Sequence, residues 1–121
     1  MDICFEGIGQ MVATFATEKA LTPGMAVTVT ASGEVGLGEK GDGSPLCGVT
    51  VGAERSGAVA VQIGGVVKVR YSGNKPAVGW TALACDGEGR VTAGSGNGAN
   101  CLVLAVNEGE DEDGKTVVIK L

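Results

Sequence analysis

The sequence predicts an all-β protein, and three observations support this prediction. Short segments rich in Val and Thr recur along the chain, and several of them alternate apolar with polar residues, as half-buried strands do. Turn sequences rich in Gly, Ser, Asn and Asp separate these segments. Only residues 16–21 (ATEKAL) have a helix-like pattern, and Pro23 follows them closely. Short strands separated by frequent turns are typical of a compact β-barrel or sandwich.

The predicted strands follow one another along most of the chain. In chain order they cover residues 11–17, 26–31, 58–63, 66–71, 81–85, 101–106 and 116–121. Many of the 22 glycines fit this pattern because they occupy turns that need a positive φ angle, as in Asp86-Gly87. Gly64-Gly65 lies between two strong strand patterns. We expect a bend or bulge there that lets one long strand serve two faces of a barrel.

The two halves of the chain resemble each other. Residues 24–63 and 79–121 each run through a glycine, a strand, a turn, two further strands, a second turn and a last strand. Chance similarity in a chain so rich in Gly and Val is the alternative explanation. A true repeat predicts two similar β-units, about 24–63 and 79–121, that share one core.

The first 22 residues lie outside this repeat and form either an N-terminal arm or an extra first strand. Residues 11–17 have the pattern of an ordinary strand, so residues 1–10 are the better candidate for an arm. Residues 23–121 then form a single domain. An arm either adds to the domain's own sheet or reaches a neighbouring molecule. Its candidate contact residues are Cys4, Phe5, Ile8 and Met11.

The composition excludes several classes of function. The chain contains no His, which removes Ser-His-Asp triads, Cys-His pairs and imidazole metal ligands. With 9 basic and 14 acidic residues its net charge is −5, whereas nucleic-acid binding needs a basic face and usually stacking aromatics. We therefore expect no catalytic residues, no cofactor and no nucleic-acid partner. Trp80, at the start of a predicted strand, is expected to anchor the core.

The cysteines and the acidic residues 108–113 are the remaining candidates for chemistry. No CxxC pair occurs, so the four cysteines are too scattered for an ordinary zinc site. Glu110, Asp111 and Asp113 are a weak candidate for a Ca²⁺ site, although Lys120 stands where an EF-hand loop needs Glu. The alternative for this segment is a solvated hairpin tip.

The first residues carry neither the basic start nor the apolar centre of a signal peptide. The sequence also contains no apolar run of the ~18 residues that a membrane span needs. We therefore expect assembly in a reducing cytoplasm, without a membrane partner and with reduced thiols.

Four segments of the chain resemble a known family. They are ALTPGMAVTVTASGEVG, LCGVTVGAERSGAVAVQIGGVVKV, PAVGWTALACDGEGRVT and NCLVLAVNEGEDEDGKTVVIKL, within residues 20–121. Their Gly and Val positions are similar to those of the small capsid cement or head-decoration proteins of tailed bacteriophages. The chain departs from the family pattern in its longer N-terminal segment and in its four cysteines.

The resemblance implies a non-enzymatic, all-β virion protein that binds the outside of the capsid and cements neighbouring capsomers. Its partners would be the major capsid protein and further copies of itself, commonly in a homotrimer, and it would assemble in the cytoplasm of the bacterial host. Two alternatives remain open. One is another oligomeric phage module, from a tail or a surface adhesin, and the other is a small ligand-binding β-barrel.

Overall fold

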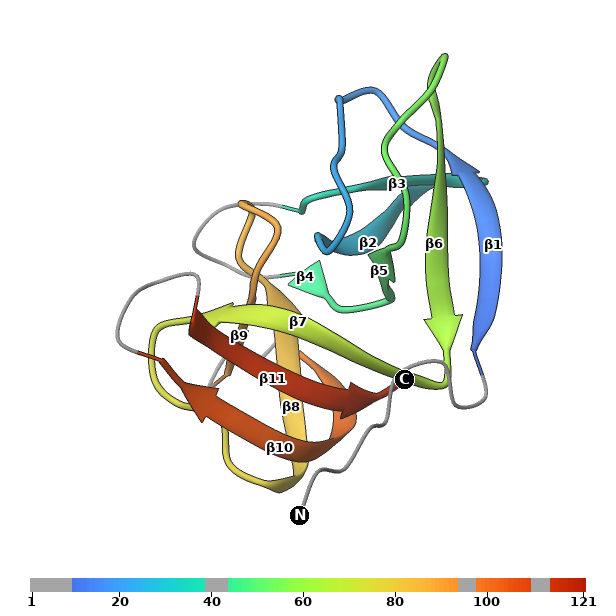
Figure 1. Ribbon diagram of the computed structural model, residues 1–121. Coiled ribbons are helices and arrows are strands. Elements are labelled where there is room, and N and C mark those ends of the chain that lie inside the picture. The colour runs from blue at the N-terminus through green and yellow to red at the C-terminus, as the bar shows by residue number, and fades with distance from the viewer. Residues whose placement is uncertain (1–9, 39–43, 94–97, 110–113) are drawn as a thin grey trace.

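The computed structural model describes residues 10–38, 44–93, 98–109 and 114–121, and it confirms the all-β prediction (Figure 1). The described residues form strands β1 (Met11–Ala16), β2 (Ala26–Ala31), β3 (Glu34–Gly36), β4 (Ser44–Pro45), β5 (Gly48–Thr50), β6 (Ala58–Gly64), β7 (Val66–Ser72), β8 (Gly79–Cys85), β9 (Val91–Ala93), β10 (Ala99–Glu108) and β11 (Lys115–Lys120). Residues 16–21 contain no helix; they pass from β1 into a loop.

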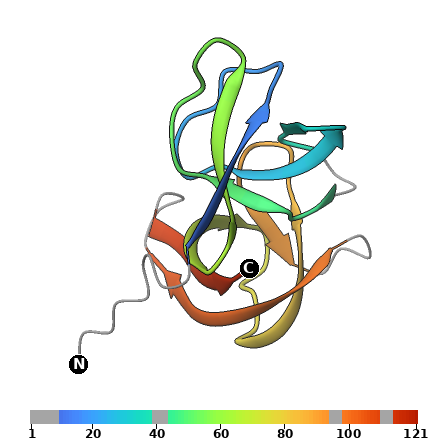
Figure 2. The same cartoon turned by 90° about the vertical axis from the view of Figure 1, so that its right-hand side faces the viewer.

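The strands are arranged in two barrels, one above the other in Figures 1 and 2. In the first barrel, the strand order β1-β3-β2-β5-β6 closes through the pairing of β1 with β6. In the second, the order is β10-β11-β7-β9-β8-β4, and the additional pairing of β10 with β8 closes five of these strands into a ring. Closure matters because it pairs strand edges that would otherwise be open to association.

The two barrels have the same topology, which supports the repeat seen in the sequence. Each contains one parallel pair, β1 with β3 and β7 with β9, and the other pairs in each ring are antiparallel. The register of the strand pairs agrees as well. Thr14 of β1 pairs with Ala60 of β6, and at the equivalent position of the second barrel Lys68 of β7 pairs with Val118 of β11. Strand β1 is therefore the counterpart of β7. Our placement of the first 22 residues outside the repeat is wrong for β1.

The buried apolar side chains form two clusters, not the single shared core that we expected. One cluster, with Leu21, Val27, Val35, Val59 and Val61, fills the first barrel. The other fills the second barrel and is built around Leu83, Val91, Val103, Val117 and Ile119. The physical reason is closure, because each ring directs alternate side chains to its own interior.

Residues from each barrel nevertheless reach into the other. Ala26 of β2 and Leu46, which follows β4, belong to the buried cluster of the second barrel. In return, the turn between β8 and β9 brings Gly89 to the first barrel, where its carbonyl accepts a hydrogen bond from the Ala26 N–H at 2.9 Å. The barrels are therefore interlocked.

The chain passes directly from one barrel to the next at Gly65. This glycine has φ +85°, a conformation that L side chains rarely adopt, and it separates β6 from β7 by one residue. The bend that we predicted at Gly64-Gly65 is present, but it joins two barrels where we expected two faces of one. Beside it, buried Gln62 donates from Nε2 to the carbonyls of Gly64 at 2.9 Å and Val66 at 3.1 Å.

Candidate functional site

Trp80 is the most exposed large apolar side chain among the described residues, so its prediction as a core anchor is wrong. Its side chain is 71% exposed, and that of Val78 nearby is 68% exposed. The reason is strand parity: Leu83 and Cys85 point into the second barrel, which leaves Trp80 on the outer side of β8. The odd spacing between Trp80 and Leu83 is the sequence signal that would have placed it outside.

The strand register places Trp80 in an outward-facing surface of the second barrel. Leu102 of β10 lies opposite Trp80, and Lys120 of β11 lies opposite Leu102. In the neighbouring row, Val118 of β11 lies opposite Lys68 of β7. We name these five residues, Trp80, Leu102, Val118, Lys68 and Lys120, the Trp80 face. It combines an apolar centre with two exposed lysines.

The two lysines of the Trp80 face are both exposed. Neither Lys68 nor Lys120 forms an ion pair or hydrogen bond with its side chain in the part of the chain that the structure describes. Within the described residues, exposed lysines without ion pairs near the exposed Trp80 suit a ligand that carries both carboxylates and apolar groups.

The first barrel does not repeat this chemistry. Thr14, Ala60 and Gln62 occupy the register positions of Lys68, Val118 and Lys120. Gln62 is buried and accepts a hydrogen bond from Gln10 at 3.5 Å, whereas Lys120 is exposed. Since the two barrels share a topology but differ here, the Trp80 face is a property of the second barrel alone.

An open groove of about 500 Å³ lies on the first barrel beside β2, β3 and β4. Thr17, Lys19, Thr30, Glu34 and Ser44 are among its lining residues. The Glu34 carboxylate accepts a hydrogen bond from the exposed Thr30 hydroxyl at 3.3 Å. The groove is open and lined by both polar and apolar residues, and the hydrogen bond between Thr30 and Glu34 is exposed.

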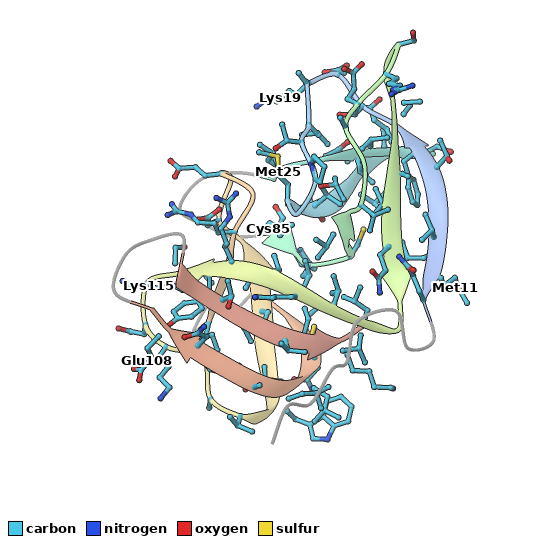
Figure 3. All side chains as sticks on the ribbon, in the orientation of Figure 1. Met11, Lys19, Met25, Cys85, Glu108 and Lys115 are labelled. Atoms are coloured by element: carbon cyan, nitrogen blue, oxygen red, sulfur yellow. The ribbon has the colours of Figure 1, made fainter. Side chains whose placement is uncertain are left out.

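The candidate contact residues of the N-terminal segment are only partly placed. Met11 is 60% exposed at the start of β1, and Figure 3 shows it pointing away from the first barrel. Cys4, Phe5 and Ile8 lie outside the described residues. The side chain of Met11 is therefore accessible to a partner.

The candidate Ca²⁺ ligands Glu110, Asp111 and Asp113 also lie outside the described residues. Next to them, Glu108 forms an exposed ion pair with Lys75 at 3.4 Å. Figure 3 shows Glu108 and Lys115 at the same end of the β10–β11 hairpin. Within residues 10–38, 44–93, 98–109 and 114–121, no group of three or more Cys, Asp or Glu residues is placed to hold a metal ion.

The three described cysteines have low reactivity because burial raises the pKa of their thiols. Burial, together with the nearby Cys47 and Asp86, raises the pKa of Cys85 to about 12. Burial also raises the pKa of Cys47, against a hydrogen bond from the Val29 backbone, and the pKa of Cys101. All three are free thiols that stay protonated at neutral pH, so none of them is an activated nucleophile.

The Asp86 carboxylate is engaged in the structure of the β8–β9 turn. It accepts hydrogen bonds from the backbone N–H groups of Glu88 and Arg90, from the Ser72 hydroxyl at 2.8 Å and from Arg90 Nε at 3.0 Å. Burial acts to raise the pKa of Asp86, but these hydrogen bonds and the Arg90 charge outweigh it and hold the pKa below its ordinary value. Asp86 therefore stays ionised and holds the turn that delivers Gly89 to the first barrel.

No known protein family matches the chain, and no curated protein matches it in sequence. None of the described residues belongs to a helix that is long and apolar enough to cross a membrane.

Proposed function

We propose that this protein is a structural component of a phage particle that binds the outside of the capsid and cements neighbouring capsomers. The resemblance of residues 20–121 to phage cement and head-decoration proteins carries the proposal. The Trp80 face supports it, because a large exposed aromatic side chain such as that of Trp80 is characteristic of interaction surfaces.

The closed barrels favour association through faces over association through strand addition. Strand β11 is paired with β10 and β7 along most of its length, and β7, β8 and β10 each have a partner strand on both sides over parts of their length. A partner is therefore recognised by side chains, with Trp80 as the anchor and Lys68 and Lys120 at the rim. The exposed Met11 supplies a further contact on the first barrel.

Many copies acting together would give the particle its added stability. A contact of the usual size, about 1,200–2,000 Å² of buried surface, is modest for one subunit. Subunits that bind both the capsid and each other add avidity to each contact. We propose a closed ring of copies, a homotrimer in the simplest case, in which each subunit contacts two neighbours and the major capsid protein.

Co-sedimentation with purified phage heads tests the proposal. The full chain is incubated with expanded heads and with unexpanded heads, and bound protein is measured after centrifugation. We expect binding to expanded heads and little binding to unexpanded ones. Heads of the phage whose genome encodes the chain are the required material, because capsid surfaces differ between phages.

Two single substitutions locate the contact. Trp80→Ser removes the centre of the Trp80 face, and we expect it to weaken binding at least tenfold. Val29→Ser is the matched control, because Val29 is an exposed apolar residue on the first barrel and its loss should leave binding unchanged. A chain that stays monomeric and ignores both kinds of head at micromolar concentration would contradict the proposal.

The groove on the first barrel is the observation that favours the alternative of a ligand-binding barrel. Its open shape argues against this alternative, because small-molecule sites usually enclose most of their ligand. Co-sedimentation with phage heads also distinguishes the capsid proposal from the tail or adhesin alternative, since a tail or adhesin module would not bind expanded heads.

A further inference from the structure

We propose that the open edge of strand β1 pairs with the same edge of a second copy, antiparallel and about a twofold axis at Ala13. On one side, β1 forms a ladder with β6 from Met11 to Ala16. On the other side, among the described residues, it pairs with β3 only through Ala16 and Glu34. Figure 1 shows β1 at the margin of the first barrel, with β6 beside it. The contact uses the first barrel, so it does not depend on the proposed role of the Trp80 face.

The backbone groups of Val12 and Thr14 point toward the open edge. The Ala16 N–H donates at 2.8 Å to a carbonyl in the turn between β2 and β3, on the side away from β6. Since successive residues of a strand direct their backbone groups to alternate sides, those of Thr14 and Val12 point the same way. The partner strand agrees, because the Ala60 carbonyl, opposite Thr14, accepts a hydrogen bond of 3.0 Å from the chain just after β5.

The core of the first barrel is incompletely covered beside this edge. Phe15 packs against the buried cluster of the first barrel but is itself only half-buried. By strand register its counterpart in the second barrel is Val69, which is 2% exposed. On the same strand Met11 is 60% exposed and Val12 is 46% exposed. A strand added at the open edge would shield these apolar side chains from water.

The β1 edge lacks the features that proteins use against strand addition. Its sequence, MVATFA, contains neither a charged residue nor a proline. The corresponding strand of the second barrel, β7, carries Lys68 and Arg70. Charged side chains on an open edge discourage association, and an uncharged edge is a ready template for another strand. The β1 edge is therefore the better site for pairing between strands of two molecules.

Strand β1 is complementary to itself when two copies run antiparallel about Ala13. In this register Val12 of one copy lies opposite Thr14 of the other, and their outward N–H and C=O groups form hydrogen bonds in both directions. Both side chains are β-branched and suit a cross-strand pair. Met11 lies opposite Phe15, which brings a thioether to an aromatic ring. At the axis the small side chain of Ala13 meets only its own copy.

A second copy is favoured over an extended segment of a different protein. All residues from Met11 to Ala16 are uncharged, so the twofold register brings no like charges together within the strand. Every outward backbone group of Val12 and Thr14 also finds its partner within the same short strand. A twofold contact closes on itself, so it gives a pair and leaves no edge for a fibre. If the copies also form the ring of the proposed function, this contact joins two rings.

Charge substitutions on the outer side of β1 test the pairing. Val12→Lys with Thr14→Lys places like charges opposite each other at both positions of the register. We expect sedimentation equilibrium to give the unmodified chain twice the mass of this variant at about 200 μM, with pairing weakened at least tenfold. Val12→Lys with Thr14→Glu in one chain places opposite charges at the same positions and should restore the larger mass.

The matched control is Val51→Lys with Ala53→Lys. These two residues are also exposed, lie two positions apart on the first barrel, and gain the same charge. The control should sediment like the unmodified chain. Equal masses for the unmodified chain and the Val12→Lys, Thr14→Lys variant at every concentration would overturn the proposal. Failure of the Lys–Glu variant to pair, with circular dichroism showing it folded, would overturn the register at Ala13.

Amide hydrogen exchange gives a second readout with an internal control. The N–H groups of Ala13 and Phe15 point toward β6, whereas those of Val12 and Thr14 point toward the open edge. Raising the protein concentration should slow exchange at Val12 and Thr14 about tenfold and leave Ala13 and Phe15 unchanged. Exchange at Val12 and Thr14 that is independent of concentration and equal in the double-lysine variant would contradict the pairing.

Head binding distinguishes this proposal from the proposed function. If the double-lysine variant has the mass of the unmodified chain but no longer binds heads, the β1 edge takes a segment of the capsid, and pairing with a second copy is overturned. If the unmodified chain pairs through β1 but ignores heads, the pairing stands and the capsid role fails. The sedimentation assay contains no heads, so each result is obtained independently of the other.

Discussion

The backbone N–H of Ala26 donates a hydrogen bond of 2.9 Å to the carbonyl of Gly89, and this bond joins the two barrels. Ala26 begins β2 of the first barrel but is fully buried in the cluster of the second. Gly89 belongs to the β8–β9 turn and has φ +89°. The barrels are therefore coupled at a backbone contact, and changes at this contact should lower the stability of both.

The first prediction concerns Gly89. Its positive φ and a new Cβ only 3.0 Å from Met25 Cγ both oppose a side chain. We expect Gly89→Ala to lower the free energy of unfolding by about 1–2 kcal/mol from the backbone conformation alone, with the Met25 contact adding to this. Urea unfolding followed by circular dichroism measures the loss. Gly52→Ala is the control, since Gly52 has open space around it and no positive φ, and an equal loss there would contradict the explanation.

The second prediction concerns Gln62, whose buried amide spans the junction at Gly65. Gln62→Leu removes the donor and leaves the carbonyls of Gly64 and Val66 without it. We expect a loss of about 1–3 kcal/mol in the free energy of unfolding, the usual cost of unsatisfied buried polar groups. Gln10→Ala removes only the partner at 3.5 Å and should cost much less. Equal losses in the two variants would show that the bonds across the junction carry no special weight.

The third prediction concerns acid stability. The folded protein lowers the pKa of Asp86, so unfolding at neutral pH leaves a carboxylate without its hydrogen bonds. The stabilisation is present above the ordinary carboxyl pKa, about 4, and is lost as the pH falls through the lower folded value. We expect the difference in stability between the unmodified chain and Asp86→Asn to be largest near pH 7 and to shrink at acid pH. Urea titrations at several pH values measure it, and a constant difference would contradict the assignment.

The fourth prediction concerns thiol reactivity. Because burial raises the pKa of Cys85 to about 12, its reactive thiolate is scarce at pH 8. Iodoacetamide should label Cys85 at least a hundredfold more slowly in the folded chain than in urea. Mass spectrometry of the digested protein assigns the label to each cysteine. Rapid labelling of Cys85 in the folded chain would mean that the second barrel opens readily.

Much of the fold followed from local sequence signals. The predicted strand at residues 58–63 corresponds to β6, and that at residues 66–71 to β7, because strong alternation of Val with other residues leaves little choice of structure. The repeat pattern indicated two further strands in each unit, but no residue range was predicted for the short strands β3, β5 and β9. Each has three residues, too few for a periodic signal, and each is held in place by pairing with distant strands.

The candidate site was harder to predict than the fold. The sequence showed a Trp at the start of a strand, and its size suggested burial, whereas the barrel placed it outside. The side of a strand that faces the core depends on its whole set of neighbours, so one large residue is a poor guide.

The sequence by itself determined that this chain is built from short strands and that it lacks the imidazole side chain on which much enzyme chemistry depends, and it predicted a repeated β-unit with chance similarity as the alternative. Only the tertiary structure decided that each unit closes into its own barrel, that β1 belongs to the repeat, and that Trp80 faces outward on the same surface as two exposed lysines. The reason is that local residue patterns specify strands and turns, whereas closure and facing depend on pairing between residues far apart in the chain.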